Sequence, residues 1–177
     1  MFRSKKDIKQ IIAIDPSLNG TGIAYSYKDR LLTTQITFKG SDLKLSHGER
    51  FGIITNRIKI IIKNILLTDE YFTPNNIAIW MEQVPFNIGR NKQGHNTLVE
   101  LHGAIKMMLS TEFNVIPNYV NVSTWKKEIV GNGRADKERI KVCVTQEYNR
   151  YFDTFDECDA FCIFKYAERK EGVTPYK

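Results

Sequence analysis

Residues 11–27 of this chain read Ile11-Ile12-Ala13-Ile14-Asp15-Pro16-Ser17-Leu18-Asn19-Gly20-Thr21-Gly22-Ile23-Ala24-Tyr25-Ser26-Tyr27. An apolar run that ends in Asp15-Pro16, a turn containing glycine and a second apolar run are typical of two antiparallel strands. A further turn at Lys28-Asp29 precedes residues 31–38. The sequence therefore predicts an antiparallel meander of three strands.

Beyond Glu49 the spacing of the apolar residues changes to three and four. That spacing is typical of an amphipathic helix, and the residues that show it are Phe51, Ile54, Ile58, Ile61 and Ile65. Residues 77–81 form a fourth apolar run that leads into Glu82. Thr97-Leu98-Val99-Glu100 has the form of a capping box, so a second long helix is predicted from about Thr97 to Ser110.

The last third of the chain is predicted to hold one more strand and two more helices. The strand covers residues 115–122 and is interrupted by Pro117. Helical spacing after the Gly131-Asn132-Gly133 turn is shown by Ile140, Val144, Tyr148 and Tyr151, and the final helix covers about residues 156–168. A meander followed by alternating strands and helices predicts an α/β fold, with a five-stranded mixed sheet and helices on both faces. No internal repeat or linker interrupts the sequence, so residues 1–177 are expected to form a single domain.

The composition limits the class of protein. The chain has 177 residues, 42% of them hydrophobic, and 26 Lys and Arg against 20 Asp and Glu give a net charge of +6. No apolar run approaches the length of about 18 residues that a membrane span needs, and no signal core follows the N-terminus. Three cysteines without paired-ligand spacing argue against a disulfide framework or zinc site, and Cys143 and Cys162 are expected to pack in helices. We therefore expect a soluble cytoplasmic protein, and the basic excess favours a polyanionic partner.

Four carboxylates stand where acidic residues are unusual. Asp15 and Glu82 each follow an apolar strand, whereas Asp156 and Asp159 are three residues apart and share one face of a helix. That face continues through Ala160, Ile163 and Ala167, which should pack on the sheet. Each acid also has an ordinary interpretation: an Asx turn at Asp15, a strand-end charge at Glu82, and acids in a first helical turn for the other two.

Convergence of the four acids would require positive charge between them. Two like charges about 4 Å apart repel by roughly 4 kcal/mol at an effective dielectric constant near 20. Shared protons or divalent cations would relieve this repulsion, and oxygen ligands without His or Cys favour Mg²⁺ or Mn²⁺ over zinc. About two such ions per site would activate a water and stabilise the leaving oxygen of a phosphodiester. In this hypothesis Asp15 bridges both ions, Glu82 and Asp159 each complete one site, and Asp156 orients the attacking water.

Four motifs in this order resemble those of the RuvC-type Holliday junction resolvases. They are Ile12 to Ser17 with Gly20-Thr21-Gly22, then Glu82-Gln83-Val84, then Gly131 to Lys137, and finally Asp156-x-x-Asp159-Ala160. The resemblance covers about residues 10–168. It implies a ribonuclease H-like fold, a homodimer, a requirement for Mg²⁺, and the cutting of four-way DNA junctions by paired nicks. By position, Asp15, Glu82, Asp156 and Asp159 match the metal-binding carboxylates of that family.

Basic residues near these motifs are candidates for contacts with DNA. Lys126 and Lys137 resemble the phosphate-contacting lysines of the family, and Lys137 is counted with the catalytic residues. Arg134 lies in the third motif, and Arg90 and Lys92 lie in a polar, basic segment that suits a loop on DNA. A solvated surface role is the alternative for all of them.

Several neighbouring residues keep more than one interpretation. Gly131 and Gly133 could present N–H groups to a phosphate or could simply form a tight turn. The family often has an aromatic residue directly after Glu-Gln-Val, whereas here Pro85 intervenes before Phe86. His47 is expected in a polar turn, His95 in the basic loop, and His102 on a helix as a structural polar residue.

The symmetry of the expected substrate favours a dimer. One carboxylate cluster cuts one strand, so a two-fold pair of clusters matches the two-fold symmetry of a four-way junction. Apolar residues cover more of the second helix than one buried stripe requires: Leu98, Leu101, Ile105, Met107, Met108 and Leu109. Part of that helix is therefore predicted to form the interface.

Three other functions compete with this interpretation. The nearest is a ribonuclease H-like nuclease of another specificity, acting on flaps, other branched DNA or RNA. An actin-like ATPase would need a second glycine-rich phosphate loop and a much longer, two-lobed chain. A catalytically silent DNA-binding module would not need the complete set of four acids.

Overall fold

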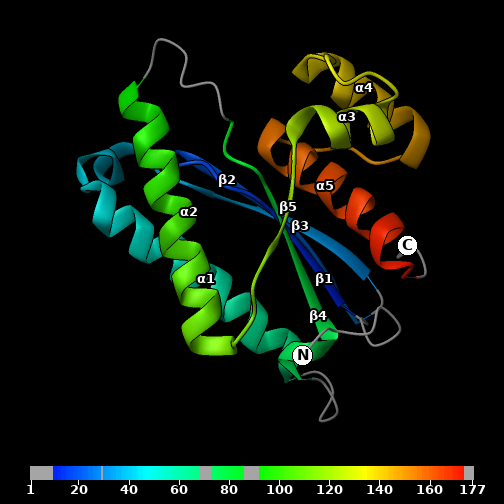
Figure 1. The fold of residues 1–177 in the computed structure, drawn as a ribbon. Coiled ribbons are helices and arrows are strands. Elements are labelled where there is room, and N and C mark those ends of the chain that lie inside the picture. Colours follow the sequence, from blue (N-terminus) through cyan, green and yellow to red (C-terminus); the bar gives the residue numbers. More distant parts are fainter. Residues whose placement is uncertain (1–9, 29, 68–72, 86–91, 174–177) are drawn as a thin grey trace.

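A five-stranded sheet forms the centre of the computed structural model, which describes residues 10–28, 30–67, 73–85 and 92–173 (Figure 1). The strands are β1 (Gln10–Asp15), β2 (Gly20–Tyr27), β3 (Arg30–Thr37), β4 (Ile77–Glu82) and β5 (Asn118–Val120), in the order β3-β2-β1-β4-β5. Neighbours β1, β2 and β3 pair antiparallel, whereas β4 pairs parallel with both β1 and β5. The predicted meander and mixed sheet are confirmed.

Side chains alternate between the two faces of the sheet and divide the core into two layers. On one face, Ile12, Ile14 and Ile79 pack against α1 (His47–Leu66) and α2 (Lys92–Phe113). On the other face, Ala13 and Ala24 belong to the layer that packs against α5 (Phe155–Glu171). Because alanines leave space on this face, α5 lies directly on β1 and β2 (Figure 1).

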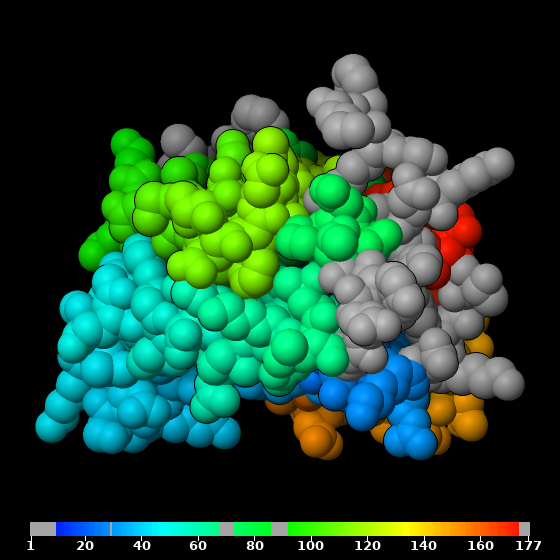
Figure 2. Space-filling model, turned by 90° about the horizontal axis from the view of Figure 1, so that it is seen from below, coloured from blue at the N-terminus to red at the C-terminus, as the bar shows by residue number. Residues whose placement is uncertain are grey.

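The helices α1 and α2 lie side by side on their face of the sheet. The helix α1 begins after Ser46, whose side chain and that of Glu49 form a capping box. Near the other end of α1, an ion pair of 2.7 Å joins Lys59 to Glu112. Viewed from below, the end of α2 lies beside the end of α1 (Figure 2).

The start of α2 corrects one prediction. The helix begins at Lys92, five residues before the predicted start at Thr97. Thr97 is buried inside the helix, and its hydroxyl donates a hydrogen bond to the Gln93 carbonyl oxygen at 3.0 Å. A threonine side chain can cap a helix, or it can donate a hydrogen bond to the carbonyl oxygen four residues earlier inside a helix. The same sequence is therefore compatible with a helix start and with a helix interior. The predicted capping box at Thr97 is therefore wrong, and His95 lies in a helix rather than in a loop.

A short helix, α3 (Val122–Val130), was not predicted. The predicted strand over residues 115–122 is reduced to the three residues of β5, because Pro117 has no N–H to give to the sheet. Asn121 then caps α3 by accepting a hydrogen bond from the Ser123 N–H. Only Trp125 and Ile129 of this helix are buried, so its apolar stripe is too brief to be recognised from spacing.

The remaining elements are close to the prediction. The helix α4 (Lys137–Tyr148) is capped by Asp136, and it ends before Tyr151, which is 79% exposed and was wrongly assigned to it. In the described part of the chain, 3₁₀ helices cover Gly40–Lys44 and Pro74–Asn76. The three cysteines are free thiols, and Cys158 and Cys162 are buried in α5. Within the described ranges, no helix combines the length and the apolar character needed to cross a bilayer.

Candidate active site

The four predicted carboxylates lie where the ends of β1 and β4 meet the first turns of α5. Asp15 ends β1 on the same face as Ala13, and Glu82 ends β4 on the same face as Ala78 and Trp80. Because β1 and β4 are parallel neighbours with Ile14 opposite Met81, their two terminal acids lie beside each other. The helix α5 begins at Phe155 and brings Asp156 and Asp159 onto the same face.

Electrostatic repulsion links the four acids. Burial raises the pKa of Asp15 well above its ordinary value, and the negative charges of Glu82, Asp159 and Asp156 raise it further. Burial and the charge of Glu82 also raise the pKa of Asp159 to about 6. Burial raises the pKa of Glu82 as well, although the hydrogen bond from Trp125 opposes this change. The site therefore crowds negative charge into a space with little water.

Two residues that sequence reasoning missed hold these carboxylates in place. The indole Nε1 of Trp125 donates a hydrogen bond to Oε2 of Glu82 at 2.9 Å. The amide Nε2 of Gln35 donates a hydrogen bond to Oδ2 of Asp156. Gln35 lies opposite Gly22 in the register of β2 and β3, so its role follows from strand pairing and not from any local motif.

Two glycines allow α5 to approach the sheet at this point. A Cβ atom on Gly22 would overlap with the main-chain carbonyl oxygen of Asp156, and a Cβ on Gly20 would overlap with the Asp156 carboxylate. Gly-Thr-Gly is therefore needed to let the first turn of α5 lie against β2. The motif serves helix packing here.

Two of the predicted basic residues lie beside the acids. Nζ of Lys137 is 3.9 Å from Oδ1 of Asp156, and the Lys137 side chain is 58% exposed. Nζ of Lys126 donates a hydrogen bond to the Ala135 carbonyl oxygen at 2.9 Å. The charge of Lys137 lowers the pKa of Asp15, Glu82 and Asp159, and the charge of Lys126 lowers the pKa of the last two.

Two other predicted basic residues, Arg134 and Lys92, are not part of this cluster. Arg134 is exposed and lines a separate hollow with Lys127 and Glu128, and Lys92 is exposed at the first residue of α2. Arg90 and Phe86 lie outside the described residues.

The two glycines of the third motif each have a structural reason. Gly131 ends α3 with a φ of +77°, and a Cβ on Gly133 would lie 2.8 Å from the Ser123 carbonyl oxygen. The tight-turn interpretation thus accounts for both glycines.

His102 is a structural residue away from the cluster. Its ring is buried and stacks with Tyr119 at 6.3 Å between centroids. Burial lowers the pKa of His102 to about 4, so at neutral pH the ring is uncharged.

The donor atoms of the cluster fit a hard divalent cation. All four side chains offer carboxylate oxygens, which are the ligands of Mg²⁺ and Mn²⁺, and the raised pKa values of Asp15, Glu82 and Asp159 indicate negative charge that a cation would stabilise. As the side chains stand, no three acidic, histidine or cysteine groups of the described residues surround a common point closely enough to hold an ion. Glu82 is held by Trp125 and Asp156 by Gln35.

The chain is similar in sequence to known proteins. No protein-family model matches the chain. It is 31% identical over 143 residues to the crossover junction endodeoxyribonuclease RuvC of Wolbachia sp. subsp. Brugia malayi (strain TRS), covering 77% of this chain and 79% of that protein. It is 28% identical over 156 residues to the protein of the same name from Ehrlichia ruminantium (strain Gardel), covering 86% and 92%.

Two solved structures have the same fold. One is the Thermus thermophilus RuvC structure, with a TM-score of 0.66 and 18% identity over 96% of this chain and 100% of that one. The other is the T. thermophilus RuvC structure in complex with Holliday junction substrate, with a TM-score of 0.67 and 19% identity over 92% and 96%. These similarities confirm the ribonuclease H-like α/β fold expected from the motifs.

Proposed function

Because the chain belongs to the RuvC family of crossover junction endodeoxyribonucleases, we propose that it cuts four-way DNA junctions by paired, symmetric nicks. The observation that carries this proposal is the meeting of Asp15, Glu82, Asp156 and Asp159, with Lys137 and Lys126 beside them. Burial and mutual repulsion make such a group of acids unfavourable for the fold, whereas a metal-dependent nuclease needs them.

The carboxylates would hold Mg²⁺, with Mn²⁺ as a substitute and about two ions per site, supplying water activation and charge stabilisation at the leaving oxygen. Asp15 interacts with all three other acids and with Lys137, so it is the natural shared ligand. Glu82 and Asp159 complete the set on either side. Asp156, at the edge of the cluster and held by Gln35, orients the attacking water.

Lys137 is the basic residue best placed to act on the phosphate. Its side chain is more than half exposed and 3.9 Å from Asp156, so its ammonium group can contact a backbone lying over the acids. A cation there would offset the negative charge that develops in the transition state. Lys126 contributes charge from its position against Ala135, and Arg134, Arg90 and Lys92 are proposed to contact DNA further from the cut.

The active enzyme is proposed to be a homodimer of single nuclease domains that acts on DNA inside the cell. One cluster cuts one strand, and a two-fold dimer presents two clusters to a junction of matching symmetry. Leu101, Ile105 and Leu109 of α2 are buried in the core of the chain itself. The exposed apolar residues of the same helix, Val99 (47%) and Met107 (67%), are therefore the proposed contacts with the second copy.

A substrate panel tests this function against the nearest alternative, a nuclease for flaps, other branched DNA or RNA. The rates of cleavage of a mobile four-way junction, a flap, an RNA–DNA hybrid and plain duplex would be compared in Mg²⁺, with Asp15→Asn as the inactive control. We expect the junction to be cut fastest, by roughly tenfold or more, a difference of about 1.4 kcal/mol in activation free energy. Equal or faster cutting of the flap or the hybrid would contradict the proposal.

A further inference from the structure

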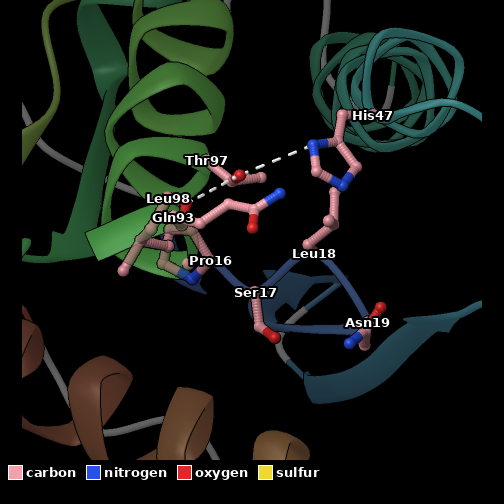
Figure 3. Close-up of a pocket in the computed structure, with 9 residues that line it drawn as sticks. Pro16, Ser17, Leu18, Asn19, His47, Gln93, Thr97 and Leu98 are labelled. Atoms are coloured by element: carbon pink, nitrogen blue, oxygen red, sulfur yellow. Dashed lines mark hydrogen bonds between the residues drawn. The ribbon is translucent and has the colours of Figure 1, made fainter. Parts of the chain in front are cut away.

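The positive charge that acts on the acids comes from α3 and α4, which carry Lys126 and Lys137. A pocket of about 450 Å³ lies beside the turn that follows Asp15. Figure 3 shows its walls, which come from this turn, from His47 at the start of α1 and from the first turns of α2. Among the described residues that line the pocket, none is Lys or Arg. A cation that acts on a phosphate at the acids is therefore supplied by α3 or α4.

The two lysines are held in different ways. Nζ of Lys126 donates a hydrogen bond to the Ala135 carbonyl oxygen at 2.9 Å. Among the described residues, Nζ of Lys137 has no hydrogen bond, and its distance of 3.9 Å from Oδ1 of Asp156 is long for an ion pair. Lys137 is also the first residue of α4, where the positive end of the helix dipole is unfavourable for a cation. Because a lysine side chain has a flexible four-carbon stem, another group is needed to restrict it.

The ring of Phe155 is placed to restrict Lys137. Nζ of Lys137 lies over this ring, 5.6 Å from its centroid, and Nζ of Lys141, one turn further along α4, lies at the same distance. An ammonium group within about 6 Å of a ring centroid is attracted by the negative face of the ring. Since Phe155 directly precedes Asp156, one turn of α5 offers a ring and a carboxylate to the same ammonium group.

The position of Phe155 is fixed by the helix start and is not explained by the core. Phe155 is the first residue of α5, and the Thr154 hydroxyl caps this helix by accepting a hydrogen bond from the Glu157 N–H at 3.2 Å. The Phe155 side chain is half-buried, and in the described part of the chain it belongs to neither apolar layer. The ring is therefore available to the lysines of α4.

We propose that Phe155 is a positioning residue for Lys137: its ring holds the ammonium group next to the acids, where this group contacts the phosphate that is cut. The inference rests on the proposed function. A divalent cation at the acids would neutralise the Asp156 carboxylate and weaken its attraction for Lys137, whereas the attraction of the ring would remain. A similar pair lies on the other side of the acids, where Nζ of Lys126 is 5.6 Å from the centroid of the Trp125 ring.

The first test compares cleavage rates of a bound junction in a single turnover at saturating Mg²⁺. Phe155→Leu keeps an apolar side chain but removes the ring, and it should lower the rate about two- to fivefold, the usual effect of an exposed cation–π contact. Phe155→Tyr keeps the ring and should keep the wild-type rate. Tyr27→Leu is the matched control, because Lys28 lies over the Tyr27 ring at 5.4 Å at the far end of β2. This control should leave the rate unchanged.

Two further readouts separate positioning of Lys137 from a structural effect on the acids. In the Lys137→Ala background, Phe155→Leu should cause no further loss of rate, because the ring acts through Lys137. The concentration of Mg²⁺ needed for half-maximal cleavage should be the same for Phe155→Leu and the wild type. An unchanged rate for Phe155→Leu, an equal loss with and without Lys137, an equal loss for Phe155→Tyr, or a higher Mg²⁺ requirement would overturn the proposal.

A second measurement needs no cleavage and so separates this proposal from the proposed function. Lysines are labelled with ¹³C at Cε, and their nuclear magnetic resonance signals are recorded without DNA or divalent ions, with that of Lys137 identified by its loss in Lys137→Arg. The ring should shift the Lys137 proton signal upfield, and Phe155→Leu should remove this shift but leave the Lys126 signal in place. A Lys137 signal without the upfield shift in the wild type, or one that Phe155→Leu leaves unchanged, would overturn the proposal. The expected shift without any cleavage of a junction in Mg²⁺ would contradict the nuclease function alone.

Discussion

Asp159 carries the most clearly defined titration of the carboxylate cluster. Burial and the charge of Glu82 raise its pKa from 3.8 to about 6. Between these pH values the folded chain holds this proton more tightly than the unfolded chain, so the contribution of Asp159 to stability falls as the pH rises through that range. The ionised carboxylate therefore destabilises the folded protein at neutral pH when no divalent cation is bound.

The first prediction concerns Asp159→Asn in the presence of a chelator. Its unfolding midpoint at pH 7 should be higher than that of the wild type, and the difference should shrink as the pH falls toward 4, because the carboxyl is then protonated in the folded state and no longer carries the charge that destabilises it. Thermal unfolding followed by circular dichroism measures both midpoints. Asp153→Asn, at an exposed acid just before α5, is the control and should change little. A lower midpoint for Asp159→Asn at pH 7 would contradict the conclusion that the ionised Asp159 carboxylate destabilises the folded protein.

The second prediction concerns Trp125→Phe, which keeps an aromatic ring in the core but removes the N–H that Glu82 accepts. A hydrogen bond to a charged group contributes about 1.5–3 kcal/mol, so the concentration of Mg²⁺ needed for half-maximal cleavage should rise at least tenfold. The matched control is Trp80→Phe, since Nε1 of Trp80 donates instead to Glu171 at the far end of α5. Equal effects of the two substitutions on the Mg²⁺ requirement would show that Trp125 only fills space.

At the scale of residues, the four acids could be predicted because each ends an apolar run or continues an apolar helical stripe. Gln35 and Trp125 could not. Gln35 reaches Asp156 only through the pairing of β3 with β2, and the position of Trp125 depends on how α3 packs against α5. Both contacts join residues far apart in sequence, and local patterns carry no information on such contacts.

At the scale of elements, the contact between α5 and the sheet positions the candidate active site. Two of the four acids belong to this helix. Its first turn fits against β2 only because Gly20 and Gly22 have no side chains. The small residues Ala13 and Ala24 continue the same close packing. A displacement of α5 would therefore move Asp156 and Asp159 away from Asp15 and Glu82.

The third prediction follows from this packing. Gly22→Ala should destabilise the fold by roughly 1–3 kcal/mol, the usual range for overpacking, and should reduce cleavage more than junction binding. Gly52→Ala is the control, because Gly52 is exposed inside α1 with no atom within 4 Å of a Cβ. Since alanine favours a helix over glycine by about 1 kcal/mol, this control should be slightly more stable than the wild type. A Gly22→Ala protein with normal stability and cleavage would contradict the close approach.

The elements themselves were predictable where the apolar pattern was long. The first two strands of the meander agree with the pattern because each is a continuous run of mostly buried residues bounded by a turn. The helices α1 and α5 agree because each offers several turns with buried residues. The predicted start of α2 is five residues too late, because the sequence of residues 97–100 is compatible both with a helix cap and with the interior of a helix. The helix α3 was missed because only two of its residues are buried.

At the scale of the whole molecule, the charge is unevenly distributed. The net charge of +6 includes 20 acidic residues, and four of these gather at one edge of the sheet. The rest of the chain is therefore more basic than the net value indicates. This distribution suits a site that binds cations, surrounded by a surface that binds a phosphate backbone.

The fourth prediction concerns the dimer. Sedimentation at micromolar concentration should show a species of twice 20.5 kDa, and Met107→Glu should shift it toward the monomer by placing a charge on the proposed contact. Val142→Glu on α4, where the residue is 52% exposed, carries the same change of charge and should remain dimeric. A 20.5 kDa species alone, with and without junction DNA, would contradict the dimer.

The most direct measurement of the central claim is cleavage of a mobile four-way junction in which the two strands of like polarity carry different labels. In Mg²⁺, the wild type should nick both strands at symmetric positions, and a chelator should abolish both nicks. Asp15→Asn should bind the junction but leave both strands intact, because the shared carboxylate is lost. Cleavage by Asp15→Asn at the wild-type rate in Mg²⁺, or full cleavage by the wild type in chelator, would contradict the account.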